Sequence, residues 1–136
     1  MGERGMNVVL DTHVAWWDAT NAADLSDAAK VAIDQADDVY LAAASWYELA
    51  WLFRSERLTP PQGQSPRQAL ETLSTAVITI PLDHVIAHQA VTLLDADDFP
   101  RDPADGQILA TAMIRGIPLI TADRAIRRAF PTHCVW

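Results

Sequence analysis

The chain of 136 residues has the length of one ordinary domain, and half of its residues are hydrophobic, which suffices for a core without disulfides. Its single cysteine excludes an intrachain disulfide framework, and no apolar run approaches the ~20 residues that cross a bilayer. The formal charge of −8, with 18 Asp and Glu against 10 Lys and Arg, taken alone argues against a nucleic-acid-binding protein and fits one that binds cations or a basic partner. Surplus carboxylates also serve solubility, so the charge decides little until the acids are located.

Short apolar runs that predict strands alternate along the chain with patterns that predict helices. In chain order we expect a strand at 7–10, helices at 14–19 and 27–36, a strand at 39–42, helices at 45–55 and from 65, a strand at 77–80, helices at 84–94 and 102–116, a strand at 119–121, a short helix after 123 and a strand at 134–136. The strands are mostly apolar throughout, which is typical of a parallel sheet covered by helices on both faces. The sequence therefore predicts an α/β fold, a three-layer α/β/α sandwich with a central, mostly parallel sheet, in one domain over residues 1–136. No segment resembles a signal peptide or a membrane span, so we expect a cytoplasmic protein.

Acidic residues gather where the predicted strands end and the following helices begin. These residues are Asp11, Glu48, Asp105 and Asp123, with Asp102 one helical turn before Asp105. Because ligands bind at the carboxyl ends of parallel strands, we expect these acids to share one site. Packed carboxylates repel one another unless a cation lies among them, and hard oxygen ligands suit Mg²⁺ or Mn²⁺. Such a site favours phosphodiester hydrolysis, in which the metal ions also supply the positive charge that the protein lacks.

Most of these acids also have a purely structural explanation. Ser45 and Glu48 have the spacing of a capping box, in which Glu48 would only bond the backbone of Ser45. Asp102 and Asp123 could cap the helices that follow them. Asp11 is the hardest to explain in this way, because it directly ends a buried strand. The convergence of the acids on one edge of the sheet, with no lysine nearby, favours a metal site.

Four ordered segments of the chain match a known family. They are V-L-D-T-H at 9–13, A-A-S-W-Y-E-L-A at 43–50, R-D-P-A-D at 101–105 with A-T-A at 110–112, and L-I-T-A-D at 119–123. With these motifs the chain resembles the PIN-domain nucleases, specifically the toxin branch of VapBC-type toxin–antitoxin pairs. The resemblance covers essentially the whole chain.

The resemblance implies a Mg²⁺- or Mn²⁺-dependent endoribonuclease toxin. It implies an RNA substrate, a cognate antitoxin and a homodimer. It assigns the metal-binding acids as Asp11, Glu48, Asp105 and Asp123, treats Asp102 as a further catalytic acid, and implies that Thr121 orients a carboxylate or a bound water. We expect the antitoxin to be a basic, disordered segment that lies along an apolar stripe near Trp46 and Trp51 and reaches the carboxylates with Arg or Lys.

Two departures from the family pattern concern substrate contacts more than the metal site. Relatives with the D-P-x-D motif commonly continue with Arg, where this chain has Gly106, and residues 97–100 replace histidines that are often seen there. Other side chains have open roles. His13 could contact substrate or be satisfied by hydrogen bonds within the fold. Trp16 and Trp17 cannot both face inward on one helix, so we expect one of them to be exposed or to lie in an interface. Flanking phosphates could be held by Arg124, Arg127 and Arg128, although arginines with this spacing on a short helix more often form a solvated surface.

Three other protein classes share parts of this pattern. A receiver-like signalling domain also binds Mg²⁺ with strand-end acids, but it needs a lysine near the last strands, and the only lysine is Lys30. A haloacid-dehalogenase-type phosphatase needs an Asp at the position of His13. A catalytically silent interaction module with the same fold is disfavoured by the complete set of acids.

Overall fold

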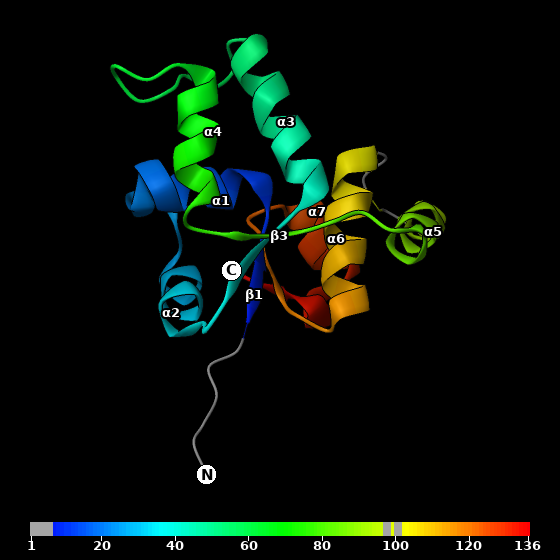
Figure 1. The fold of residues 1–136 in the computed structure, drawn as a ribbon. Coiled ribbons are helices and arrows are strands. Elements are labelled where there is room, and N and C mark those ends of the chain that lie inside the picture. Colours follow the sequence, from blue (N-terminus) through cyan, green and yellow to red (C-terminus); the bar gives the residue numbers. More distant parts are fainter. Residues whose placement is uncertain (1–6, 97–98, 100–101) are drawn as a thin grey trace.

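The computed structural model describes residues 7–96, 99 and 102–136 (Figure 1). Five parallel strands form one sheet in the order β3-β2-β1-β4-β5, with β1 at Val8–Leu10, β2 at Val39–Ala42, β3 at Ile78–Ile80, β4 at Leu119–Ile120 and β5 at Cys134–Val135. The helices are α1 at Thr12–Thr20, α2 at Asp27–Gln35, α3 at Ala43–Arg54, α4 at Pro66–Ser74, α5 at His84–Leu93, α6 at Pro103–Arg115 and α7 at Arg124–Ala129, with short 3-10 turns at Ala22–Asp24 and Pro131–His133. The parallel sheet predicted from the apolar runs is confirmed.

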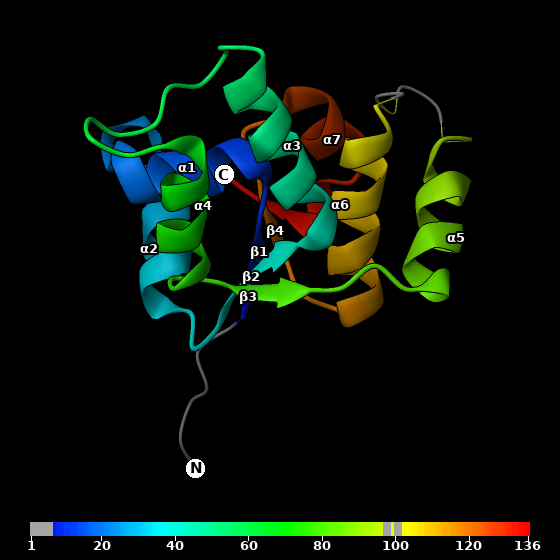
Figure 2. The same ribbon diagram turned by 45° about the horizontal axis from the view of Figure 1, so that its top comes forward.

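Helices cover both faces of this sheet, so the three-layer prediction is also confirmed. Successive side chains of a strand point to opposite faces, and Val8 and Leu10 of β1 pack into one core with α1, α2, α3 and α4, while Val9 packs into the other with α5, α6 and α7. Figure 2 shows α1, α2 and α4 on one side of the sheet and α6 on the other, with α5 beyond α6. Because a core covers each face of the sheet, the inner strands β1, β2 and β4 show no alternation of apolar and polar residues.

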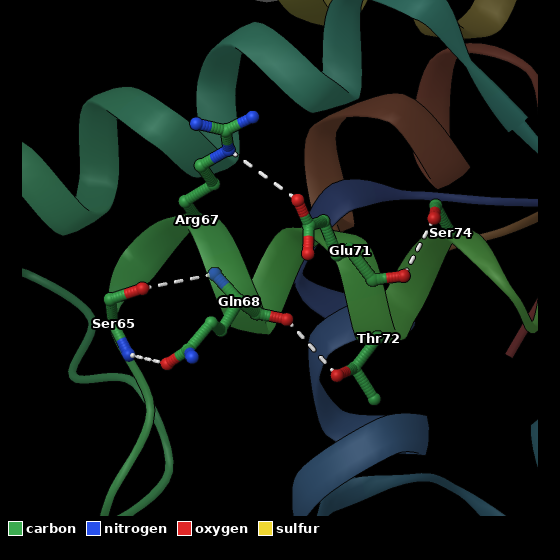
Figure 3. Close-up of polar contacts among 6 residues, drawn as sticks. All are labelled: Ser65, Arg67, Gln68, Glu71, Thr72 and Ser74. Atoms are coloured by element: carbon green, nitrogen blue, oxygen red, sulfur yellow. Dashed lines mark hydrogen bonds and ion pairs between the residues drawn. The ribbon is translucent and has the colours of Figure 1, made fainter.

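The starts of several helices are fixed by side-chain caps. The side chain of Asp11 caps α1, which therefore begins two residues earlier than predicted. Gly116 ends α6 as predicted, in the left-handed conformation that glycine adopts without strain. A full capping box starts α4 (Figure 3). The Ser65 hydroxyl accepts a hydrogen bond from the backbone amide of Gln68, and the side-chain oxygen of Gln68 accepts one from the backbone amide of Ser65.

One prediction about a side chain was wrong, and another is met only in part. Ser45 does not cap α3, because that helix begins at Ala43 directly after β2 and its N-cap is Ala42. Trp16 and Trp17 are both half-buried, Trp16 against Phe53 and Trp17 against Trp136, so neither is exposed and the interface alternative stays a prediction. The segment at 97–100 that was expected to replace family histidines lies outside the described residues except for Phe99.

The family departure at Gly106 has a packing explanation. Gly106 is buried where α6 crosses α5, and a Cβ at this position would lie 3.2 Å from the carbonyl oxygen of Ala90. An arginine there would have to push the two helices apart. Gly106 therefore serves the contact between α5 and α6. Of the helices described, none has the length and apolar character of a membrane span.

Candidate active site

The predicted acids line one open cleft at the carboxyl end of the sheet. The cleft has a volume of about 430 Å³ and is lined by Asp11, Glu48, Asp102, Asp105 and Asp123 together with His13, Val14, Trp17, Arg57 and Ala122. The acids come from the end of β1, from α3, from the start of α6 and from the end of β4. These elements meet in the upper half of Figure 2, where α1, α3, the first turn of α6 and α7 come together.

Asp11 is held by hydrogen bonds to both of its carboxylate oxygens. The Thr12 amide donates to Oδ1 over 2.8 Å, and the Thr121 hydroxyl donates to Oδ2 over 2.6 Å. The Thr121 hydroxyl in turn accepts the amide of Asp123 over 3.1 Å. One buried threonine at the end of β4 thus connects two of the predicted acids and fixes the direction in which Asp11 presents its free lone pairs.

Glu48 reaches the cleft from the second turn of α3. Because α3 begins at Ala43, Glu48 does not lie in the first turn, and its predicted capping-box bond to Ser45 is not formed. Ser45 is fully buried, and its hydroxyl oxygen accepts a hydrogen bond of 3.0 Å from the Thr12 hydroxyl. This contact ties α3 to α1 one turn before Glu48 and turns that face of α3 toward Asp11. The structural explanation of Glu48 is therefore wrong.

Asp102 and Asp123 combine a helix cap with a place in the cleft. Oδ1 of Asp102 accepts the Ala104 amide over 2.9 Å, and Oδ1 of Asp123 accepts the Ile126 amide over 3.0 Å. Each cap occupies one carboxylate oxygen, which leaves the other available to a ligand in the cleft. For these two acids the structural and the functional interpretation are compatible.

Burial and crowding raise the pKa of two carboxyl groups of the cleft, those of Asp11 and Asp105. Burial, followed by the charges of Asp11, Asp102, Asp123 and Glu48, raises the pKa of Asp105 to about 7. Burial also raises the pKa of Asp11, although its hydrogen bonds from Thr121 and Thr12 and the charge of His13 act in the opposite direction. In the described part of the chain the only ion pair is Arg67–Glu71 on the surface of α4 (Figure 3), so no salt bridge there compensates the acids of the cleft.

Residues 8–130 match the PIN domain family. The chain belongs to this family. Ribonuclease VapC22 of Mycobacterium tuberculosis is 43% identical to it over 121 residues, which make up 88% of this chain and 89% of that protein. The resemblance inferred from the four sequence motifs is thereby confirmed.

Solved structures share the fold of this PIN domain. VapC20 of Mycobacterium tuberculosis, described as a sarcin–ricin loop cleaving toxin, superposes with a TM-score of 0.64 at 21% identity over 90% of this chain and 94% of that one. A toxin–antitoxin complex from Klebsiella pneumoniae contains a chain with a TM-score of 0.61 at 18% identity over 90% of this chain and 89% of that one. At such identities the likeness concerns the fold alone.

The chemistry of the cleft in this PIN domain fits a divalent metal ion. All five acids offer oxygen ligands. Burial and then the neighbouring carboxylates raise the pKa of Asp105, and a bound cation would neutralise that negative charge. Among the described residues, no three His, Cys, Asp or Glu side chains stand close enough to enclose an ion by themselves. That openness is compatible with Mg²⁺, which usually keeps several waters and uses only one or two carboxylates.

One basic residue of the cleft, Arg57, was not predicted from the sequence. It lines the cleft beside the acids. Arg124, Arg127 and Arg128 of α7 are not among the lining residues, which agrees with the solvated-surface interpretation of these arginines. Arg57 follows the end of α3, and no motif in the sequence connects it with the acids. His13 also lines the cleft and is exposed in the first turn of α1, which favours the substrate-contact interpretation over a histidine satisfied within the fold.

Proposed function

We propose that this PIN domain is a metal-dependent endoribonuclease that acts in the cytoplasm as the toxin of a toxin–antitoxin pair. The observation that carries the proposal is the convergence of five acids from four separate parts of the chain on one cleft. Curated and solved relatives are described as a ribonuclease and as a toxin that cleaves the sarcin–ricin loop. The single domain over residues 1–136 would carry the whole activity.

The proposed metal ligands are Asp11, Glu48, Asp105 and Asp123, some binding the ion directly and the others through its waters, with Asp102 as a further catalytic acid of the cleft. The ion would be Mg²⁺ or Mn²⁺, which can bind a phosphodiester, lower the pKa of a water and stabilise the leaving oxygen. Asp11 is oriented for this role by Thr121, while Asp102 and Asp123 keep one oxygen free of their helix caps. Glu48 is presented by α3, whose position is fixed by the Thr12–Ser45 bond.

Activity is tested by RNA cleavage with purified protein in Mg²⁺ or Mn²⁺ and in EDTA. Cleavage should require the metal, and Asp11→Asn and Asp105→Asn should each abolish it, because an amide binds a divalent ion far more weakly than a carboxylate. Asp34→Asn is the matched control, since it removes one carboxylate from the exposed face of α2, away from the cleft. Undiminished cleavage by the two cleft variants, or by wild type in EDTA, would overturn the mechanism.

The proposed partner is an antitoxin with a basic, apolar segment. One solved structure of this fold is a toxin–antitoxin complex. The expected stripe needs one revision, because Trp46 is half-buried and its indole nitrogen donates to Thr79 over 2.9 Å. The exposed aromatic side chains of α3 are Tyr47, at 78%, and Trp51, at 53%. A homodimer, which is also part of the proposal, would present two acidic clefts to such a partner.

The toxin role is tested by expression in cells. Growth should stop when the chain is expressed alone, and it should resume on co-expression with the neighbouring small gene or in the Asp11→Asn variant. Light scattering of the purified protein checks the dimer. A wild-type chain that accumulates in folded form without affecting growth would remove the toxin role and leave the nuclease to be judged by the cleavage assay.

A further inference from the structure

Arg57 is the one basic side chain, apart from His13, that lines the acidic cleft in the described part of the chain. It is exposed, and the ion pair found in that part of the chain, Arg67–Glu71, does not involve it. An arginine beside several carboxylates and without a salt bridge is available for an anion that enters the cleft. Its guanidinium can donate two parallel hydrogen bonds to a phosphate.

The backbone holds Arg57 at this position. After α3 the chain turns at Glu56, whose φ of 60° lies in the left-handed region. The Glu56 amide then donates to Phe53 over 3.1 Å, and the Arg57 amide donates to Leu52 over 2.9 Å. These two bonds form a Schellman motif, with Arg57 as its final residue. Because the next residue, Leu58, packs against the core, the base of the Arg57 side chain is anchored on both sides.

An aromatic pair lies in the same cleft. His13 and Trp17 are one turn apart on α1, and their ring centroids are 5.9 Å apart at an interplanar angle of 47°. Trp17 is half-buried against Trp136, which fixes it, while His13 is exposed. Both line the cleft together with Asp11 and Arg57. Nucleobases stack on rings of this kind in proteins that bind single-stranded nucleic acid.

We propose that Arg57, His13 and Trp17 form a subsite for one nucleotide of the RNA, adjacent to the carboxylates. Arg57 binds the phosphate that follows or precedes the bond to be cleaved, and the His13–Trp17 pair stacks on the base of that nucleotide. The proposal rests on the proposed nuclease function, and it explains how a protein of charge −8 holds a polyanion beside its acidic centre. In this arrangement the carboxylates bind the metal, and Arg57, His13 and Trp17 bind the RNA.

Binding rather than cleavage tests this subsite, so that its failure differs from failure of the nuclease. A fluorescein-labelled single-stranded RNA of mixed sequence is titrated with protein in Ca²⁺, and anisotropy gives Kd. Arg57→Ala should raise Kd roughly tenfold. It should also lower the slope of log Kd against log salt concentration by about the amount expected for one lost phosphate contact. The Kd of Arg57→Lys should lie between those of Arg57→Ala and wild type, because lysine keeps the positive charge but lacks the planar guanidinium that donates two parallel hydrogen bonds.

The control for charge is Arg54→Ala, which removes an exposed arginine from the last turn of α3, outside the cleft. It should change Kd less than about twofold, since phosphate contacts rather than net charge dominate. If Arg57→Ala and Arg54→Ala weaken binding equally, or if wild type does not bind RNA, the subsite is overturned. If wild type binds RNA and Arg57→Ala weakens binding more than Arg54→Ala does, but wild type does not cleave RNA, only the nuclease function is overturned.

An abasic strand of the same length separates the base contact from the phosphate contact. His13→Ala should raise Kd for the RNA about fivefold, because stacking contributes roughly 1–3 kcal/mol per base, and it should leave Kd for the abasic strand unchanged. Arg57→Ala should weaken both strands. An equal effect of His13→Ala on the two strands, or no effect on either, would remove the stacking pair from the subsite. Thermal melts confirm that each variant is folded.

Discussion

The hydroxyl of Thr121 donates a hydrogen bond of 2.6 Å to Oδ2 of Asp11, although 110 residues separate them in the chain. Since β1 and β4 are neighbours in the sheet, with Leu10 beside Ile120, the residues that follow them come together at the same edge. The same hydroxyl accepts the Asp123 amide. Thr121 therefore acts as a positioning residue for two acids of the cleft.

Replacement of Thr121 tests this positioning role. Thr121→Val keeps the shape of the side chain but removes both hydrogen bonds, and we expect metal affinity and cleavage to fall about 10- to 100-fold, as for other partners of metal ligands. Thr121→Ser keeps the hydroxyl and should retain most of the activity. Calorimetric titration with Mn²⁺ measures affinity directly. If the valine and serine variants bind Mn²⁺ with equal affinity and cleave RNA at equal rates, the Thr121 hydroxyl does not position the acids.

Asp105 makes the stability of the metal-free protein depend on pH. Its pKa is raised from 3.8 to about 7, so its favourable contribution is fully present below pH 3.8 and is lost as the pH rises through about 7. Asp105→Asn should leave stability unchanged at low pH and raise it by about 1–2 kcal/mol at pH 8, allowing for solvent screening in an open cleft. Urea unfolding in EDTA at both pH values measures this. Mn²⁺ should stabilise wild type at pH 8 more than Asp105→Asn. A variant with the same pH slope as wild type would contradict the prediction.

Replacement by alanine should lower the stability of the fold at Ser65 but not at Glu48. Ser65→Ala breaks the capping box of α4 and should lower the free energy of unfolding by about 1 kcal/mol. Glu48→Ala breaks no cap, because α3 starts at Ala43, and it removes one charge from the cleft, so stability should stay within about 0.5 kcal/mol or rise. Denaturant unfolding compares the two. A loss of about 1 kcal/mol at Glu48 would restore the capping interpretation.

Gly106 should tolerate no arginine despite the family pattern. Gly106→Arg places a long side chain where a Cβ would already lie 3.2 Å from the Ala90 carbonyl oxygen, and we expect a loss of more than about 2 kcal/mol. Ile114→Arg is the control, because this residue of α6 is 43% exposed and its replacement introduces the same side chain. Thermal melts distinguish the two. If both variants melt at the same temperature, the close contact between α5 and α6 does not explain why residue 106 is a glycine.

The sequence alone determined the order of the elements and the identity of the acids. Apolar runs such as Val8–Leu10 predict buried parallel strands because both faces of the sheet must be covered. The acids were found because strand ends share one edge of such a sheet, a rule that depends on chain order and not on contacts. The ends of the elements were less predictable, since Ser45 has the local signature of a cap and the structure uses it to contact Thr12.

Only the tertiary structure decided which other side chains join the acids and why Gly106 is a glycine. Arg57 reaches the cleft through a turn after α3, and Gly106 faces a carbonyl of another helix. Such contacts depend on how helices pack in three dimensions, and a local pattern of hydrophobicity carries no information about them. The pKa of Asp105 is likewise set by burial and by the charges of four acids, of which Asp11, Glu48 and Asp123 come from other parts of the chain and approach Asp105 only after folding.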